Sequence, residues 1–367
     1  MMIEPITTSE TPVASDTPGR VDLLGLSREQ LAAVLAPVVD KPFRVKQIHQ
    51  ALYERGVRDF SAMTELSKEL RARLAERFRI GLPAIASRHE SSDGTCKYLF
   101  RLHDGATVEA VDIPDEGRRT FCISSQAGCA LACTFCVTGY WGAGRNLTAG
   151  EIVAQVLAIR ADRGLPAEGL NIVFMGMGEP LLNVESVKAA LDILTEFISP
   201  HRITVSTVGI LPGLEEMARW ERRPNLAISL HAPDEERRSQ VMPVNRTYPL
   251  AELLPALRRY PLEKGRKLTF EYILIRDFND SPRDADQLSR LLTGLKAKIN
   301  LIPVNPDPVL GERMQPPDDD RIEAFKQRLR QRGWIATVRR RRGDDVSAAC
   351  GQLRAVGREA RGFRKKA

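Results

Sequence analysis

Three cysteines stand close together in the segment GCALACTFC: Cys129, Cys133 and Cys136, with the spacing C-x3-C-x2-C. Zinc ribbons usually pair two C-x2-C knuckles, and the sequence has no second knuckle. Three thiolates on one loop suit a 4Fe–4S cluster that leaves one iron open. That iron could bind a small chelator, such as the amino and carboxylate groups of a methionine-derived cofactor. The surrounding glycines and threonines would make a poor apolar core, which argues against three structural cysteines.

The remaining cysteines are Cys96, Cys122 and Cys350. Six cysteines are too few for a disulfide scaffold in a chain of 367 residues. By residue type alone, Cys350 would be a small buried hydrophobe, and Cys96 is interpreted as structural. By residue type and spacing alone, the C-x3-C-x2-C motif therefore indicates a function, and the three other cysteines do not.

A glycine-rich turn in FMGMGEP follows a β-rich run and contains Gly178 and Glu179. Such a turn lets the backbone approach a ligand, and Glu179 can accept hydrogen bonds from an ammonium group. By itself the motif is equally compatible with an ordinary turn after a strand. Further candidates occupy later predicted strands or their ends, where capping is the alternative role; these residues are Ser206, Ser229, Leu230, His231 and Asn305.

The elements that must position these residues alternate in type from about residue 118. The β-rich runs are 120–124, 171–175, 202–207, 225–230, 267–275 and 298–304, and the helical windows include 148–162, 184–197, 249–260, 282–294 and 319–332. Repeated β-then-α units predict an α/β fold with a parallel sheet, closed only partly into a barrel. In such sheets the chemistry gathers at the C-terminal ends of the strands.

The flanking regions divide the chain further. Residues 1–20, rich in Pro, Ser and Thr, are predicted to be a disordered tail. A capping box at 27–30 and periodic apolar residues through 43–55 and 66–78 predict a helical domain over 21–85. Alternation in 95–101 and 106–113 predicts a β-hairpin linker over 86–116. The core barrel then covers 117–345, and a C-terminal segment covers 346–367.

Positive charge is concentrated at the C-terminus. The chain carries a formal net charge of +7, yet residues 321–367 alone hold 15 lysines and arginines against 4 acidic residues, including the run 339–342. This charge is equally compatible with a surface that binds a polyanion and with a solvated basic tail. No uncharged apolar stretch is long enough to span a membrane, and the N-terminus lacks a secretory pattern. We therefore expect a cytoplasmic protein with no membrane partner.

Several motifs together resemble the RNA adenine carbon-2 methyltransferase family of the radical S-adenosylmethionine (SAM) superfamily, known as RlmN, with Cfr as its carbon-8 relative. The matching segments, in order over roughly residues 23–355, are CISSQAGCALACTFC, GRNLTAGEIV, FMGMGEPLLN, AISLHAP, LIPVNP and RRRGDDVSAACGQL. One departure is Val208, where the family usually has serine. The resemblance implies a partial (β/α)6 radical-SAM barrel and makes the helical domain an RNA-binding accessory domain.

The resemblance also implies a role for each candidate residue. The cysteines of GCALACTFC would hold the cluster, and Glu109 would be the proton acceptor. Cys350 would accept a methyl group, and Cys122 would later form a transient disulfide with it. SAM, used twice per turnover, would contact residues from four strand ends: Gly178, Glu179, Ser206, Ser229, Leu230, His231 and Asn305.

The implied reaction is radical methylation of carbon 2 of adenine, an electron-poor carbon that does not attack a methyl sulfonium. The implied substrates are 23S ribosomal RNA and a subset of transfer RNAs. The implied partners are an electron donor such as flavodoxin or ferredoxin, and a thiol reductant. Three alternatives stay open at this point: Cfr-like methylation of carbon 8, a radical enzyme acting on a small molecule, and a non-catalytic RNA-binding protein.

Overall fold

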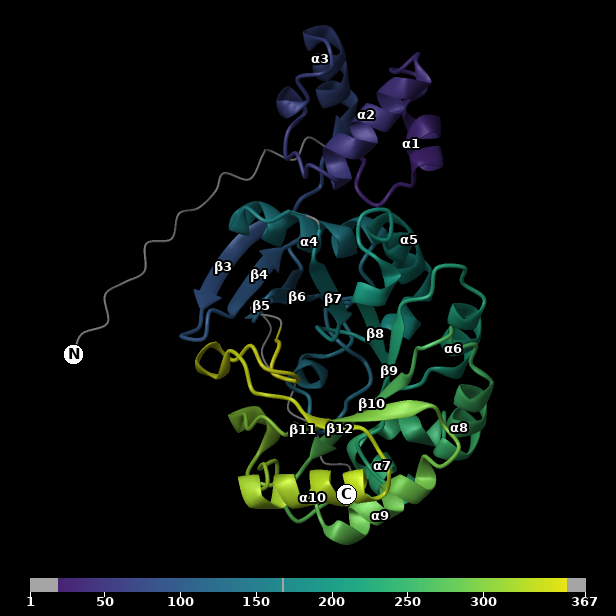
Figure 1. Cartoon of the computed structure of the whole chain (residues 1–367). Helices are drawn as coiled ribbons and strands as arrows, with labels where there is room; N and C mark the ends of the chain where they lie inside the picture. Colours follow the sequence, from purple (N-terminus) through teal and green to yellow (C-terminus); the bar gives the residue numbers. More distant parts are fainter. Residues whose placement is uncertain (1–18, 167, 355–367) are drawn as a thin grey trace, which may run out of the picture.

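The computed structural model describes residues 19–166 and 168–354 (Figure 1). The predicted disordered tail therefore lies outside the described residues, apart from Gly19 and Arg20, and so does the basic end of the C-terminal segment, 355–367.

Three helices form the N-terminal part, as the sequence predicts: α1 (Arg28–Leu35), α2 (Pro42–Tyr53) and α3 (Lys68–Arg77). The predicted capping box is present, because the Ser27 hydroxyl accepts from the Gln30 amide and the Gln30 side chain accepts from the Ser27 amide. A short parallel pair, β1 (Val21–Asp22) and β2 (Phe78–Arg79), closes the unit.

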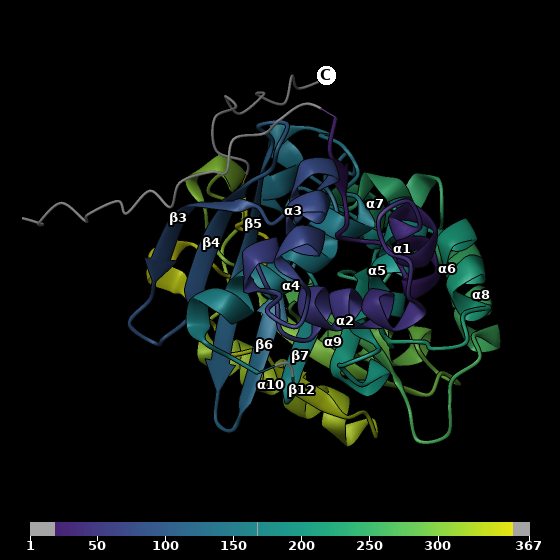
Figure 2. The same cartoon turned by 90° about the horizontal axis from the view of Figure 1, so that it is seen from above.

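The N-terminal helices pack on the core through α4 (Ala149–Arg163), as Figure 2 shows from above. Arg160 of α4 donates to the carbonyl oxygens of Tyr53 and Glu54 at 3.1 and 2.8 Å. Gly150 approaches the backbone so closely that an added Cβ would lie 2.5 Å from the Leu24 oxygen. These contacts fix the helical part against the outer layer of the core.

One sheet of ten strands forms the core, in the order β12-β11-β10-β9-β8-β7-β6-β5-β4-β3. Its parallel strands are β6 (Arg118–Cys122), β7 (Leu170–Phe174), β8 (Ile203–Thr207), β9 (Asn225–Ser229), β10 (Leu268–Leu274), β11 (Ala297–Pro303) and β12 (Ala336–Val338). All six predicted strands are confirmed. The sheet is curved but not closed into a full barrel (Figure 1).

Helices between the strands cover the outer face of this sheet (Figure 1). The predicted helices are confirmed as α4, α5 (Val184–Leu194), α8 (Leu250–Arg259), α9 (Pro282–Leu291) and α10 (Asp319–Gln331). Two more helices, α6 (Leu211–Ala218) and α7 (Glu235–Val241), were not predicted. Covered strands are buried on both faces, which explains the nearly continuous apolar run of β10.

The predicted hairpin is present as β4 (Cys96–Arg101) and β5 (Thr107–Asp115), but it is not a separate linker sheet. An unpredicted strand, β3 (Ala84–Glu90), pairs with β4, and β5 pairs antiparallel with β6. The hairpin thus extends the core sheet, because its inner strand is hydrogen-bonded to the first parallel strand. This extension brings β5 beside the C-terminal ends of the parallel strands.

After β12 the chain turns back onto the concave side of the sheet, between β5 and β11 (Figure 1). We call residues 343–354 the C-terminal loop. The Gly343 amide donates to Asp93, and the Ser92 amide donates to Asp345, so the loop is fastened to the β3–β4 turn. In the described part of the chain, no helix is long and apolar enough to cross a membrane.

Candidate active site

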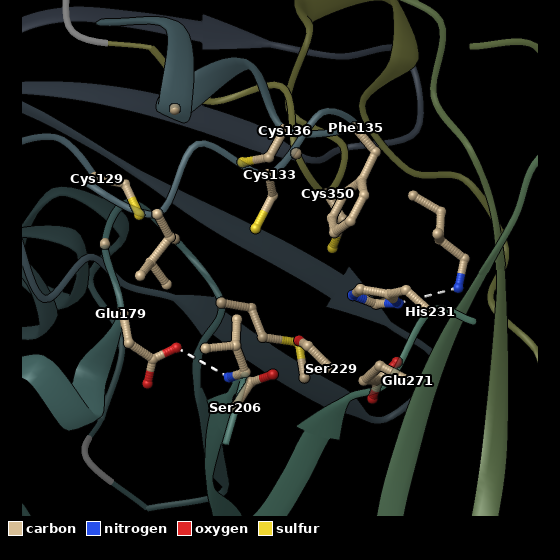
Figure 3. A pocket seen from close by; sticks show the side chains of 18 of the residues that line it. Cys129, Cys133, Phe135, Cys136, Glu179, Ser206, Ser229, His231, Glu271 and Cys350 are labelled. Carbon is tan, nitrogen blue, oxygen red and sulfur yellow. Dashed lines mark hydrogen bonds between the residues drawn. The ribbon is translucent and has the colours of Figure 1, made fainter. Parts of the chain in front are cut away.

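A cavity of about 870 Å³, part of it open to solvent, lies at the C-terminal ends of the parallel strands (Figure 3). Nine of the predicted site residues line it: Cys129, Cys133, Cys136, Gly178, Glu179, Ser206, Ser229, His231 and Cys350. Four predicted residues lie outside its lining, namely Glu109, Cys122, Leu230 and Asn305, and each is placed below.

The three clustered cysteines lie on the loop between β6 and α4 and form one wall of the cavity (Figure 3). Ala132 in this loop has a left-handed φ of 52°, and Cys136 begins a 3-10 turn over Val137–Trp141. Burial raises the pKa of the Cys129 thiol to about 12 and also raises the pKa of the Cys136 thiol. Because iron binds thiolates, loading a metal would release these protons.

The donor set fits a 4Fe–4S cluster. Three sulfurs from one loop face a cavity, and each would bind a different iron. In residues 19–166 and 168–354, no group of three or more His, Cys, Asp or Glu side chains is close enough together to hold a single metal ion. A cubane does not require single-ion spacing, because its cysteines are spread over several irons.

Glu179 lies opposite the cysteines, in the turn after β7 (Figure 3). Only 3% of the residue is exposed, and its two oxygens accept from the Leu181 and Val208 amides at 2.9 and 3.0 Å. Burial nevertheless raises the pKa of this carboxyl to about 7, against the lowering effect of Thr207 and the two amides. A cationic ligand group in the cavity would stabilise the ionised form, so Glu179 fits the ammonium group of SAM.

The other predicted cofactor contacts come from β8 and β9. Ser206 and Ser229 both line the cavity. His231, just after β9, has a left-handed φ of 61°; its Nδ1 accepts from the Ile273 amide, and its ring meets Phe135 edge-on at 4.6 Å. Burial lowers the pKa of His231 to about 3, so the ring is neutral. The Leu230 side chain is fully buried, and its amide donates to Glu271.

Cys350 reaches the cavity from the C-terminal loop, and three hydrogen bonds hold this part of the loop in place. Asn305 donates to the Cys350 carbonyl oxygen at 3.0 Å, which places Asn305 at the loop rather than in the cavity lining. Val137 donates to the Gly351 oxygen at 2.6 Å, directly after the cluster cysteines. Thr138 donates to the Leu353 oxygen at 2.7 Å. The residues that follow Cys350, Gly351 and Leu353, are therefore hydrogen-bonded to the turn that follows the cluster cysteines.

Cys122 ends β6 and is 5% exposed. Burial and, to a smaller extent, the nearby Cys350 raise the pKa of its thiol to about 12 against the lowering effect of Arg339. Cys122, at the end of β6, and Cys350, in the C-terminal loop, are thus near enough for one thiol to affect the pKa of the other. The third cysteine outside the cluster motif, Cys96, is fully buried on β4 and pairs in register with Asp112.

Glu109 lies on β5, under the C-terminal loop, and is 3% exposed. One oxygen accepts from the Arg354 amide at 2.8 Å, and the other lies 3.2 Å from the Lys97 ammonium. Burial raises the pKa of Glu109, while Lys97 and Arg354 lower it. The predicted proton acceptor is thus a buried carboxyl that is hydrogen-bonded to the loop bearing Cys350, at a residue four positions after that cysteine.

Two charged residues at the site were not predicted, Glu271 and Arg339. Glu271 on β10 lines the cavity, and its carboxylate accepts from Asn300 at 2.7 Å. Arg339 belongs to the basic run that the sequence suggested for polyanion binding, but it turns inward and donates to the Met175 sulfur at 3.4 Å. The Cys350 sulfur raises the pKa of Arg339 more than any other group. The sequence offers one signal for Glu271, because an acidic residue stands inside the otherwise apolar strand FEYILI.

Comparisons with known proteins agree with this geometry. A sequence model of the radical SAM superfamily matches residues 123–288, and a model of the ribosomal RNA large subunit methyltransferase N-terminal domain matches residues 21–80. The dual-specificity RNA methyltransferase RlmN of Halorhodospira halophila is 48% identical, over 94% of this chain and 96% of that protein. Its namesake from Syntrophotalea carbinolica is 47% identical, over 93% and 92%.

A solved structure is similar over almost the same length. It is a radical SAM methyltransferase from Sphaerobacter thermophilus, 45% identical, with a TM-score of 0.85 over 91% of this chain and 99% of that one. The fold described above is thus shared, over nearly its whole length, with a solved relative. At this identity and coverage, the chain belongs to the RlmN family of radical SAM RNA methyltransferases.

Proposed function

We propose that the chain is a dual-specificity RNA methyltransferase that methylates carbon 2 of adenine, and that Cys350 carries the methyl group to the base. The observation that carries this proposal is the position of Cys350. It lines the same cavity as Cys129, Cys133 and Cys136, although it lies far from them in the sequence, near the C-terminus. A cysteine kept only for packing would not need to face the cluster loop across a cavity with Glu179 on its far wall.

The chain uses a 4Fe–4S cluster and SAM, the two cofactors of its superfamily. Cys129, Cys133 and Cys136 would hold the cluster, and Glu179 would accept the ammonium group of SAM beside Gly178, Ser206 and Ser229. When bound, the cluster and SAM would supply a methyl group from one SAM molecule and a carbon-centred radical from a second. This chemistry suits carbon 2 of adenine, because that carbon is too electron-poor to take a methyl group as a nucleophile.

Three residues of the chain act in turn on the RNA. Cys350 is first methylated on sulfur; after its methyl group loses a hydrogen, the remaining carbon bonds to carbon 2 of adenine. Glu109 then accepts the proton from carbon 2. The one electron left on the adduct passes to the oxidised form of the electron donor. The Cys122 thiolate then attacks the Cys350 sulfur: a disulfide forms as the bond from that sulfur to the methylene carbon breaks, and this carbon takes up a proton to become the methyl group of the released base. The electrostatic interaction of the Cys122 and Cys350 sulfurs supports this order, since the last step requires them to meet.

The target adenine must leave any base-paired stack to enter this cavity, so the substrate is an unpaired or extruded base of a structured RNA. We assign this role to adenines of 23S ribosomal RNA and of a subset of transfer RNAs. The helical domain over 21–85 and the exposed Arg340 and Arg341 are the proposed contacts to RNA phosphates. Residues 86–116, 117–345 and 346–367 then provide the sheet extension, the core barrel and the segment that bears Cys350.

Each turnover ends with a Cys122–Cys350 disulfide and needs an electron for cofactor cleavage. The proposal therefore includes a thiol reductant and an electron donor such as flavodoxin or ferredoxin. A reducing compartment is required to reset the disulfide, which supports a cytoplasmic location.

The experiment uses the reconstituted enzyme and RNA from cells that lack this activity. After reaction with SAM and a reductant, the RNA is digested and its nucleosides are identified by mass spectrometry. The proposal predicts 2-methyladenosine, formed by the parent chain and absent with Cys350→Ala. Formation of 8-methyladenosine would instead support the Cfr-like alternative, and no methylated adenosine would refute both.

A further inference from the structure

A buried lysine accompanies the proposed proton acceptor. Lys97 on β4 is 8% exposed, and its ammonium nitrogen lies 3.2 Å from Oε1 of Glu109. The two residues are diagonal neighbours on paired antiparallel strands, because Leu99 stands opposite Glu109 and Lys97 stands opposite Val111. Their side chains therefore leave the sheet on the same face, toward the C-terminal loop.

The same ammonium also touches the loop that carries Cys350. Its nitrogen lies 3.4 Å from the carbonyl oxygen of Ser347, a residue with a left-handed φ of 50°. Lys97 thus bridges the carboxylate of Glu109 and the backbone just before Cys350. A buried charge without a partner is costly, so the position of Lys97 depends on Glu109 being ionised.

The charged groups that face Glu109 come from two elements. Lys97 projects from β4, and Arg354 of the C-terminal loop contributes its amide and the charge of its guanidinium. That guanidinium is itself paired with Asp307 at 2.9 Å. Arg354 belongs to the C-terminal loop, so its contact with Glu109 depends on the position of that loop. Lys97 stays beside Glu109, because strand pairing holds both residues.

We propose that Lys97 is a positioning residue that keeps Glu109 ionised and in place to accept the proton from carbon 2 of adenine. The inference rests on the proposed function of Glu109. In this step the carboxylate takes the proton, and the electron pair of the C–H bond stays on the adenine ring. Methylation of Cys350, the earlier step, involves no proton transfer to Glu109 and does not depend on Lys97.

The test compares Lys97→Met, Glu109→Gln and the double variant in the reconstituted enzyme, with Lys188→Met as a control that removes an exposed ion pair on α5. Two quantities are measured: Cys350 methylation by intact mass, and the rate of 2-methyladenosine formation from pre-methylated enzyme across a range of pH. Without its cation, Glu109 binds a proton more tightly, so the Lys97→Met rate should fall near neutral pH and recover as the pH rises. We expect a displacement of at least about one pH unit, or about tenfold in rate on the acid limb.

Lys97→Met should still methylate Cys350, and the double variant should be no slower than Glu109→Gln, because the lysine acts only through the carboxylate. An unchanged pH profile, additive losses in the double variant, or loss of Cys350 methylation together with product formation would each overturn the inference. A Glu109→Gln enzyme as fast as the parent would be a different failure. It would refute the proposed role of Glu109 itself, and the role of Lys97 with it.

Discussion

Replacing Glu179 by glutamine should weaken SAM binding without removing the cluster. The carboxylate is 3% exposed, and its two oxygens accept from the Leu181 and Val208 amides, which fix its orientation in the cavity. A hydrogen bond to a charged group is worth about 1.5–3 kcal/mol, which corresponds to roughly 10- to 150-fold in affinity. Glutamine also offers one acceptor oxygen where two amides need partners, so the turn itself should lose stability.

Binding should depend on pH in the parent and not in the variant. Since burial raises the pKa of Glu179 to about 7, the free pocket holds a neutral carboxyl below that pH and a carboxylate above it. The ammonium group binds the carboxylate, so affinity should fall by up to about tenfold per unit as the pH drops below 7, and the variant should show no such fall over this range.

The assay is calorimetric titration of SAM into the oxidised, cluster-loaded enzyme under anaerobic conditions, so that no cofactor is cleaved. Glu185→Gln, on the exposed start of α5, is the matched control and should bind as the parent does. Iron content and thermal unfolding are measured for each protein. If Glu179→Gln bound SAM with parental affinity and the same pH dependence, the assignment of Glu179 to the ammonium group would be refuted.

Three further predictions concern the cysteines and the basic run. Cys133→Ala should lose the cluster, measured as iron and sulfide per chain; full iron content would contradict the cluster assignment. Cys122→Ala should accumulate cross-linked to RNA, because the adduct forms but no thiol resolves it, whereas Cys350→Ala should form no cross-link; a ribonuclease-sensitive slow band on denaturing gels reports the difference. Changing Arg340 and Arg341 together to Gln should weaken RNA binding and flatten its dependence on salt, because fewer counterions are released; an unaltered salt slope would mean that these side chains do not contact phosphates.

Much of the fold was predictable because the alternation of β-rich and helical windows is strong from residue 118 onward. The two helices that were missed lack the usual signals. α6 contains Pro212 and Gly213 near its start, and α7 reads EERRSQV, with no apolar stripe to reveal a buried face. The alternation of apolar and polar residues predicts the hairpin. It does not predict that the hairpin joins the core sheet, because periodicity carries no information on which strands pair, here β5 with β6.

The site divides in the same way. Local spacing was enough to propose a cluster at Cys129, Cys133 and Cys136, because three ligands on one loop are visible in the sequence. Cys350 became a candidate only through the family resemblance, since folding alone brings it to the turn that follows the cluster cysteines. Lys97 was not identified at all, because a lysine in an alternating strand reads as solvent-facing unless the covering loop is known.

The central claim is that the methyl group reaches RNA by way of Cys350, and an isotope experiment tests it most directly. Enzyme methylated at Cys350 with trideuteromethyl SAM is freed of small molecules and then reacted once with RNA, reductant and unlabelled SAM. One deuterium is removed before the carbon bonds to adenine, so the account predicts 2-methyladenosine carrying two deuterium atoms. A product carrying three deuterium atoms, which indicates direct methyl transfer, or none, which indicates that the methyl group on Cys350 is not used, would contradict it.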